Sequence, residues 1–154
     1  MNLPHSDDLG IEHLSRLFDN KSECYKLFWF QAIVNKVITG KQVLSINELL
    51  NEMIADSWYM VTEYKLNLGP KDNLEILVQY IYDREQGRLK TNEEKTNILQ
   101  FLENCSDRKV KSIKQTLKLN VPYRLQSPFY RHLKGQAEWK ATEKNLIQKI
   151  NCIY

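Results

Sequence analysis

Basic side chains at helical spacing are the residues of this chain best placed to do chemistry. Lys111, Lys114 and Lys118 recur at intervals of three and four residues, and Arg108 and Lys109 precede them. Residues at these intervals share one side of an α-helix, so the lysines are expected to form a stripe. Each cation in such a stripe can neutralise one phosphate, which gives salt-sensitive binding that does not depend on base sequence. The predicted nucleic-acid contacts are Arg108, Lys109, Lys111, Lys114, Lys118 and Arg124.

Two interpretations of this basic segment stay open. The stripe can contact a nucleic acid, or it can be the solvated face of an ordinary amphipathic helix that packs Val110, Ile113 and Leu117 on a core. Aromatic residues between the later cations, such as Tyr123 and Trp139, leave the same choice, because their rings can stack on bases or pack in a core. In both interpretations the helix docks its apolar side and leaves its lysines in solvent.

Charge is distributed unevenly along the 154 residues, although the net charge is only +3. Residues 1–104 contain 11 Lys or Arg and 16 Asp or Glu, a balance of −5, whereas residues 105–154 contain 11 and 3, a balance of +8. A basic last third on an acidic body predicts a polyanionic partner, such as DNA, or an acidic protein surface.

Helix start and stop signals predict an all-α fold of about six or seven helices. Capping side chains accept bonds from the orphan N–H groups of the first turn and so mark where helices begin. The predicted caps are Ser22, Ser45 with Glu48, Asp72, Thr91 with Glu94, Ser106 and Thr142. The predicted helices span residues 10–19, 24–38, 46–65, 73–85, 93–104 and 107–118, with a last one from about 142. Pro122 and Pro128 are expected to hold residues 121–129 extended.

Residues 24–38 are expected to form the central helix of a single domain. Apolar side chains occupy nearly all sides of a helix between Ser22 and Gly40, and a helix that is apolar all round is a buried one. Residues 1–9 are expected to be a flexible leader, and residues 10–154 the helical domain, with its basic third at 105–154. The predicted core is Leu27, Phe28, Phe30, Ile33, Val34, Val37, Leu50, Ile54, Trp58, Val61, Leu77, Ile81, Leu99 and Leu102.

No residue pattern typical of a metal or catalytic site is recognisable in the sequence. A zinc site needs several convergent ligands, and the histidines and cysteines are isolated from one another. They are His5, His13, His132, Cys24, Cys105 and Cys152. Neither a phosphate-binding glycine loop nor a hydrolase motif is present. We therefore expect no cofactor and no activity in this chain, reduced thiols, a cytoplasmic location and no membrane span.

Several segments taken together are similar to one known family. They are residues 14–18, 25–30, 53–61, 65–69, 122–125 and 127–129, and the strings MIADSWYMV and PYRLQSPF are the most specific of them. These segments resemble the N-terminal helical region of bacterial HNH endonuclease-domain proteins. The resemblance covers roughly residues 11–154.

The resemblance implies a module that accompanies a nuclease. In that family an HNH domain follows, where a His activates water and a divalent ion stabilises charge developing on phosphate. This sequence stops at Tyr154 before any such domain, as a fragment would, and neither the Asn nor the His of an HNH site follows His132. No catalytic residue is therefore carried over, and a divalent metal is expected only in the HNH domain.

Two functions are consistent with these observations. The first is a non-catalytic helical module that assists DNA binding or positions a C-terminal HNH domain. The second is a protein-interaction or scaffold module that makes no contact with nucleic acid.

Overall fold

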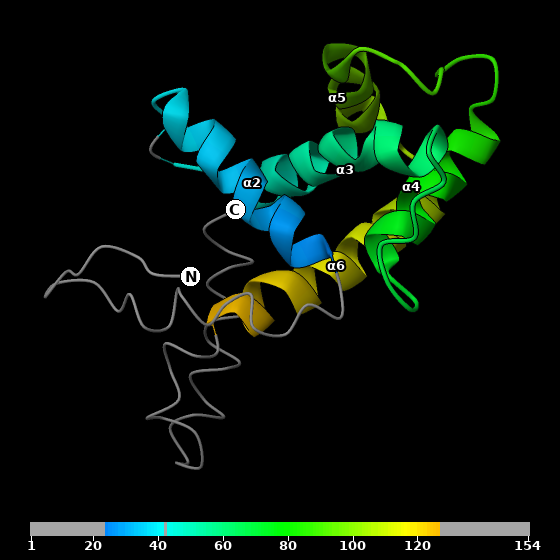
Figure 1. The fold of residues 1–154 in the computed structure, drawn as a ribbon. Coiled ribbons are helices and arrows are strands. Elements are labelled where there is room, and N and C mark those ends of the chain that lie inside the picture. Colours follow the sequence, from blue (N-terminus) through cyan, green and yellow to red (C-terminus); the bar gives the residue numbers. More distant parts are fainter. Residues whose placement is uncertain (1–23, 42, 127–154) are drawn as a thin grey trace, which may run out of the picture.

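Five helices form the part of the chain that this computed structural model describes, residues 24–41 and 43–126, with side chains through Leu119. They are α2 (Tyr25–Ile38), α3 (Ile46–Thr62), α4 (Asn73–Arg84), α5 (Lys95–Asn104) and α6 (Arg108–Gln126) (Figure 1). No strand occurs in these described ranges, so the all-α prediction is confirmed. The expected number of six or seven helices is not confirmed, because the helices predicted at 10–19 and from 142 lie outside the described residues.

The helix at the centre is α3, and the prediction that residues 24–38 form the centre is wrong. α3 contacts each of the other four described helices, and Figure 1 shows it running through the middle of the arrangement. Twelve of its 17 residues are buried. Met53, Ile54 and Trp58 are almost completely inaccessible, and they form the middle of the hydrophobic core.

α2 buries one stripe and not its whole surface. Tyr25, Phe28, Trp29 and Ala32 recur at intervals of three and four residues, and they are its buried side chains. The helix packs mainly along α3, which leaves its other sides at the edge of the core. Of the predicted core residues, Leu27, Phe30, Val34 and Val37 are exposed, Ile33 and Leu99 are partly buried, and the rest are buried.

Polar residues obscured the central position of α3 in the sequence, but each polar side chain that this helix buries has a partner. The Ser57 hydroxyl donates to the Met53 carbonyl oxygen at 2.8 Å, and the Thr62 hydroxyl donates to that of Trp58 at 2.8 Å. Such bonds to the preceding turn satisfy a hydroxyl inside a core. The Trp58 indole N–H donates to the Lys90 carbonyl oxygen at 2.9 Å, which ties the α4–α5 connection to α3.

The predicted ends of the central helices are largely confirmed. Ser45 and Glu48 form a complete capping box at the start of α3, and the Asp72 side chain caps α4 by accepting from the Leu74 N–H at 2.7 Å. Gly40 follows α2 with φ of +79°, where only a residue without a Cβ adopts the left-handed conformation freely. The N–H groups of Gly40 and Lys41 donate to the carbonyl oxygens of Val37 and Lys36, which completes a Schellman motif.

Four helix boundaries differ from prediction, and one of them is the end of α3, which lies at Thr62 and not at about residue 65. Glu94, not Thr91, precedes the first residue of α5, and Asp107, not Ser106, caps α6 by accepting from the Val110 N–H at 2.8 Å. α6 also continues through Pro122 to Gln126, so the prediction of an extended segment at residues 121–129 is wrong for residues 121–126. Proline removes one helical hydrogen bond and disfavours a helix interior without forbidding it. The cap predicted at Ser22 lies outside the described residues.

Candidate nucleic-acid interface

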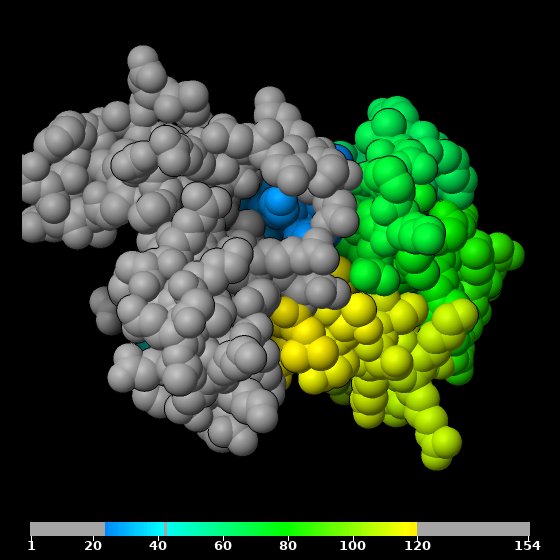
Figure 2. Space-filling view, turned by 90° about the horizontal axis from the view of Figure 1, so that it is seen from below, coloured from blue at the N-terminus to red at the C-terminus, as the bar shows by residue number. Residues whose placement is uncertain are grey.

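α6 is held against α4 and α3 by its apolar side. Val110 and Leu117 are buried in the core, and Ile113 packs partly against it, as their spacing predicts. Asp107 fixes the first turn and also forms an ion pair with Arg84 of α4. The yellow segment of Figure 2 shows that α6 also forms part of the molecular surface beside the green residues. The helix is therefore positioned to present one side to a partner.

Three lysines of α6 line a groove between this helix and the first two turns of α3. The groove has a volume of about 230 Å³. Lys111, Lys114 and Lys118 come from α6, and Asn47 is the polar residue that α3 contributes. The remaining lining residues are Gln115, Ile46 and Leu50. The structure thus brings together the three lysines that the sequence placed on one stripe.

Lys114 differs from the exposed lysine that the sequence predicted. It is half-buried, and its ammonium group donates to the Asn51 side-chain oxygen of α3 at 2.6 Å. Burial lowers the pKa of Lys114, and the electrostatic influence of Cys105 acts in the opposite direction. An ammonium group that has lost part of its hydration interacts more strongly with an anion than a fully hydrated one.

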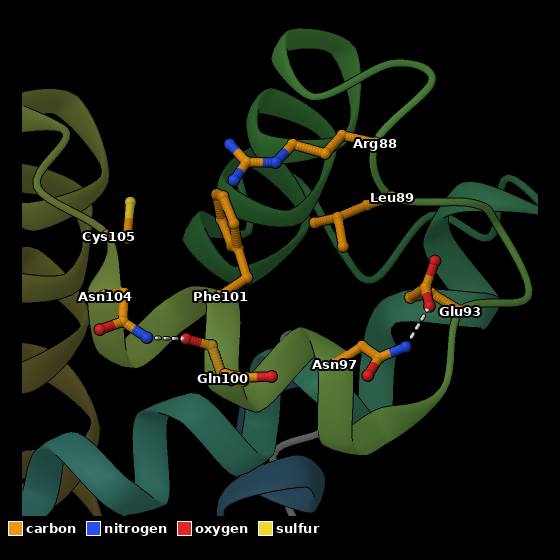
Figure 3. A pocket seen from close by; sticks show the side chains of 8 residues that line it. All are labelled: Arg88, Leu89, Glu93, Asn97, Gln100, Phe101, Asn104 and Cys105. Atoms are coloured by element: carbon orange, nitrogen blue, oxygen red, sulfur yellow. Dashed lines mark hydrogen bonds between the residues drawn. The ribbon is translucent and has the colours of Figure 1, made fainter.

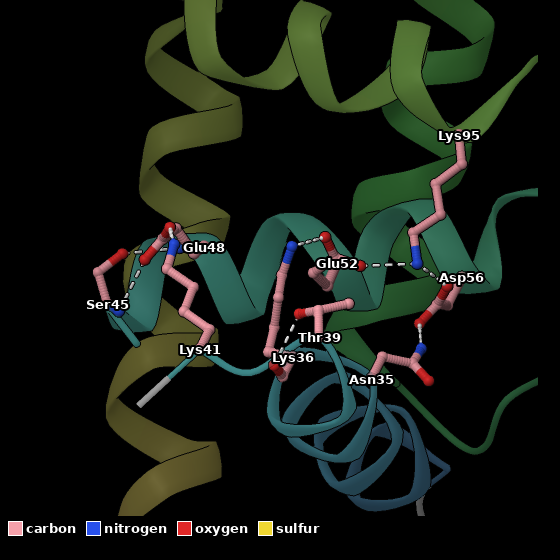
Figure 4. Close-up of polar contacts among 9 residues, drawn as sticks. All are labelled: Asn35, Lys36, Thr39, Lys41, Ser45, Glu48, Glu52, Asp56 and Lys95. Atoms are coloured by element: carbon pink, nitrogen blue, oxygen red, sulfur yellow. Dashed lines mark hydrogen bonds and ion pairs between the residues drawn. The ribbon is translucent and has the colours of Figure 1, made fainter. Parts of the chain in front are cut away.

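Acidic residues do not neutralise the groove. No carboxylate of the described residues forms an ion pair with Lys111, Lys114 or Lys118. The carboxylates of α3 are paired with other lysines: Figure 4 shows Glu48 beside Lys41, and Glu52 between Lys36 and Lys95. The residues 108–126 include six Lys or Arg and neither Asp nor Glu. The groove is therefore a concentration of positive charge that can hold an anion.

The other predicted contact residues do not join this groove. Arg108 and Lys109 are exposed in the first turn of α6, and the Lys109 ammonium lies 4.2 Å from the centroid of the Tyr80 ring. This cation–π contact directs Lys109 toward α4. Arg124 lies in the last turn of α6, and its side chain is outside the described part.

Asn47 and Asn51 are the site residues that the sequence argument missed. They are four residues apart, so they share the side of α3 that faces α6. Asn51 is only 3% exposed, and it directly follows the apolar pair Leu49 and Leu50 in the sequence. A buried amide normally has a hydrogen-bond partner, so its position was a signal that a polar group from elsewhere approaches α3.

The described residues contain neither a candidate metal site nor a candidate membrane span. No cluster of three or more His, Cys, Asp or Glu in that part of the chain could hold a metal ion. No helix among those residues combines the length and apolar character that crossing a bilayer requires.

Comparison of the chain with models of known protein families, with curated proteins and with solved structures found no match.

Proposed function

We propose that this chain is a DNA-binding helical module that holds the phosphate backbone in the groove between α3 and α6. The observation that carries the proposal is the convergence of Lys111, Lys114 and Lys118 on one groove without an acidic partner among the described residues. Contacts to phosphates are independent of sequence, so the module assists binding and does not select a site. The resemblance to HNH endonuclease-domain proteins extends the proposal to a module that positions a nuclease domain on DNA.

A fluorescence-anisotropy titration of labelled duplex at several salt concentrations tests the groove. The informative variant is Lys111→Gln/Lys118→Gln, because Lys114 is half-buried and its reversal to Glu would place a carboxylate against Asn51. The slope of log K against log[salt] should be about −0.9 for each phosphate neutralised. Removal of two contacts should weaken binding and make that slope shallower by about 1.8.

The matched control is Lys71→Gln/Lys90→Gln, which removes the same charge from two exposed lysines outside α6. If both double variants weaken binding equally, the effect is one of net charge and the groove is not the contact surface. Absence of any binding by the wild-type protein at about 50 mM salt, where phosphate contacts are strong, would reject the DNA proposal.

A protein-interaction module is the second candidate function, and the outer side of α2 favours it. Val37 and Ile38 are 58% and 78% exposed, and Val43 in the next connection is 73% exposed. Exposed apolar side chains that lie close together are typical of surfaces that bind proteins. Sedimentation equilibrium with and without Ile38→Asp discriminates the two: self-association that this substitution abolishes would favour the interaction module.

A further inference from the structure

A second cavity lies between α5 and the connection from α4 to α5, and none of the groove lysines lines it. Its volume is about 420 Å³, which is within the range of about 300–1,000 Å³ typical of small-molecule sites. Figure 3 shows its walls, formed by one side of α5 and by the segment that carries Arg88. The basic stripe does not account for this cavity.

Three carboxamides line the α5 side of the cavity. Asn97, Gln100 and Asn104 are spaced by three and four residues, and all three are exposed. Asn97 donates one amide hydrogen to Glu93 at 2.7 Å, and Asn104 donates one to the Gln100 carbonyl oxygen at 2.8 Å. These bonds orient the two amides, and each keeps its oxygen and a second hydrogen for a ligand. No described residue hydrogen-bonds the Gln100 side chain.

An aromatic ring and a guanidinium group complete the walls. Figure 3 shows the side chains of Phe101 and Arg88 extending toward one another from opposite sides of the cavity. Phe101 is partly exposed and Arg88 is exposed. Aromatic rings and guanidinium planes are the two kinds of surface on which unpaired bases stack in proteins.

The charges of the cavity favour an uncharged ligand over a phosphate. Arg88 is the only cation among the described residues that line it, and its guanidinium lies 3.6 Å from the Glu85 carboxylate. The Glu93 carboxylate also lines the cavity and would repel an anion. Carboxamides present a donor beside an acceptor, which matches the alternating donors and acceptors on the edge of a nucleobase.

We propose that this cavity binds a single unpaired nucleobase, which stacks on Phe101 and Arg88 and hydrogen-bonds to Asn97, Gln100 and Asn104. The cavity also includes Cys105, three residues before Arg108 in the first turn of α6. A strand whose base occupies the cavity can therefore continue along the basic helix. Only this continuation rests on the proposed function, because base binding itself needs no lysine of α6.

Nucleosides test the cavity separately from the groove, because they carry a base and no phosphate. Adenosine, guanosine, cytidine and uridine are titrated to millimolar concentration into ¹⁵N-labelled protein, and the side-chain amide resonances are followed. We expect saturable shifts of Asn97, Gln100 and Asn104 with at least one nucleoside. Gln100→Ala/Asn104→Ala should weaken that binding by about tenfold or more, and so should Phe101→Leu, which removes the stacking ring but keeps an apolar side chain.

Gln31→Ala is the matched control, since it removes an exposed amide from α2 and should leave nucleoside binding unchanged. No saturable shift with any of the four nucleosides, or shifts that survive Gln100→Ala/Asn104→Ala, would overturn the proposal. Binding of a short peptide in place of every nucleoside would also overturn it. Base binding by a protein that fails to bind duplex would support the cavity while rejecting the DNA proposal. Duplex binding without any nucleoside binding would support the DNA proposal and reject the base-binding cavity.

Discussion

At the scale of single residues, Lys114 both lines the groove and hydrogen-bonds to α3. Its side chain is half-buried, and its ammonium group donates to Asn51 of α3. Long cationic side chains can pack an apolar stem and still present a charged end. Burial lowers the pKa of Lys114, so keeping this side chain protonated in the folded state reduces the free energy of unfolding. An anion bound in the groove would offset that loss of stability.

Glu48 supplies a pH test of the cap of α3. The hydrogen bond from Lys41, together with the bond from the Ser45 backbone, lowers the pKa of Glu48 to about 2 from its ordinary 4.5. A carboxylate with a lowered folded-state pKa stabilises the fold above pH 4.5, and that stabilisation is lost as pH falls from 4.5 toward 2. Glu48→Gln keeps an acceptor for the Ser45 N–H but has no charge to titrate.

We therefore expect wild-type protein to be more stable than Glu48→Gln in urea at pH 7 and the difference to shrink steadily toward pH 2. Glu103→Gln, at an exposed position near the end of α5, is the control and should follow the wild-type pH dependence. A wild-type advantage that stays constant over this pH range would contradict the assignment.

At the scale of elements, an Ile→Ala substitution in α3 and one in α2 should differ in their effect on stability. Ile54 of α3 has no exposed surface, whereas Ile38 at the end of α2 is 78% exposed. Ile54→Ala should lower the free energy of unfolding by about 2–5 kcal/mol, because it removes buried methyl groups and leaves a cavity. Ile38→Ala should change it by no more than about 0.5 kcal/mol. Urea denaturation of both variants measures the difference. Equal losses of unfolding free energy would contradict the assignment of α3, and not α2, as the central helix.

At the scale of the whole molecule, α3 carries a row of acidic residues that other elements neutralise. Glu48, Glu52 and Asp56 are spaced by four residues, where like charges repel along a helix. Figure 4 shows the lysines that oppose this repulsion, with Lys36 reaching from α2 and Lys95 from α5. Lys95 lies 2.6 Å from both Glu52 and Asp56, and Asn35 donates to Asp56 at 3.3 Å. These contacts join α2, α3 and α5.

The network should respond unequally to loss of its two kinds of charge. The Glu52 side chain is 4% exposed, whereas those of Lys36 and Lys95 are 25% and 40% exposed. Burial raises the pKa of Glu52, but the hydrogen bonds from Lys36 and Lys95 outweigh burial and hold it below its ordinary value. Without these lysines, a buried carboxylate would have no compensating charge, while without the carboxylate the lysines can still reach water.

Lys36→Met/Lys95→Met should therefore destabilise the protein by about 3–5 kcal/mol, and Glu52→Gln by clearly less. Thermal and urea denaturation at pH 7 measure both, with Lys71→Met/Lys90→Met as the control for removal of two exposed lysines. Greater loss from Glu52→Gln than from the double lysine variant would show that the pairing is not what stabilises this region.

Features that depend on near neighbours in the chain were determined by the sequence alone. The all-α class, the capping box at Ser45, the cap at Asp72 and the left-handed end at Gly40 all follow from contacts within a few residues. The same local rule placed Lys111, Lys114 and Lys118 on one side of a helix. The HNH resemblance and the DNA contact stay predictions, since they concern a partner.

Tertiary structure decided which helix is central, which lysines converge and where the cavities lie. Each depends on partners far apart in the chain, such as Lys114 with Asn51 at a separation of 63 residues, or Lys95 with Asp56 at 39. The sequence predicted α2 as the central helix because apolar residues occupy nearly all of its sides. Distant lysines and nearby carbonyl groups satisfy the buried polar side chains of α3, and these lysines, 16 to 63 residues away, cannot be read from local spacing.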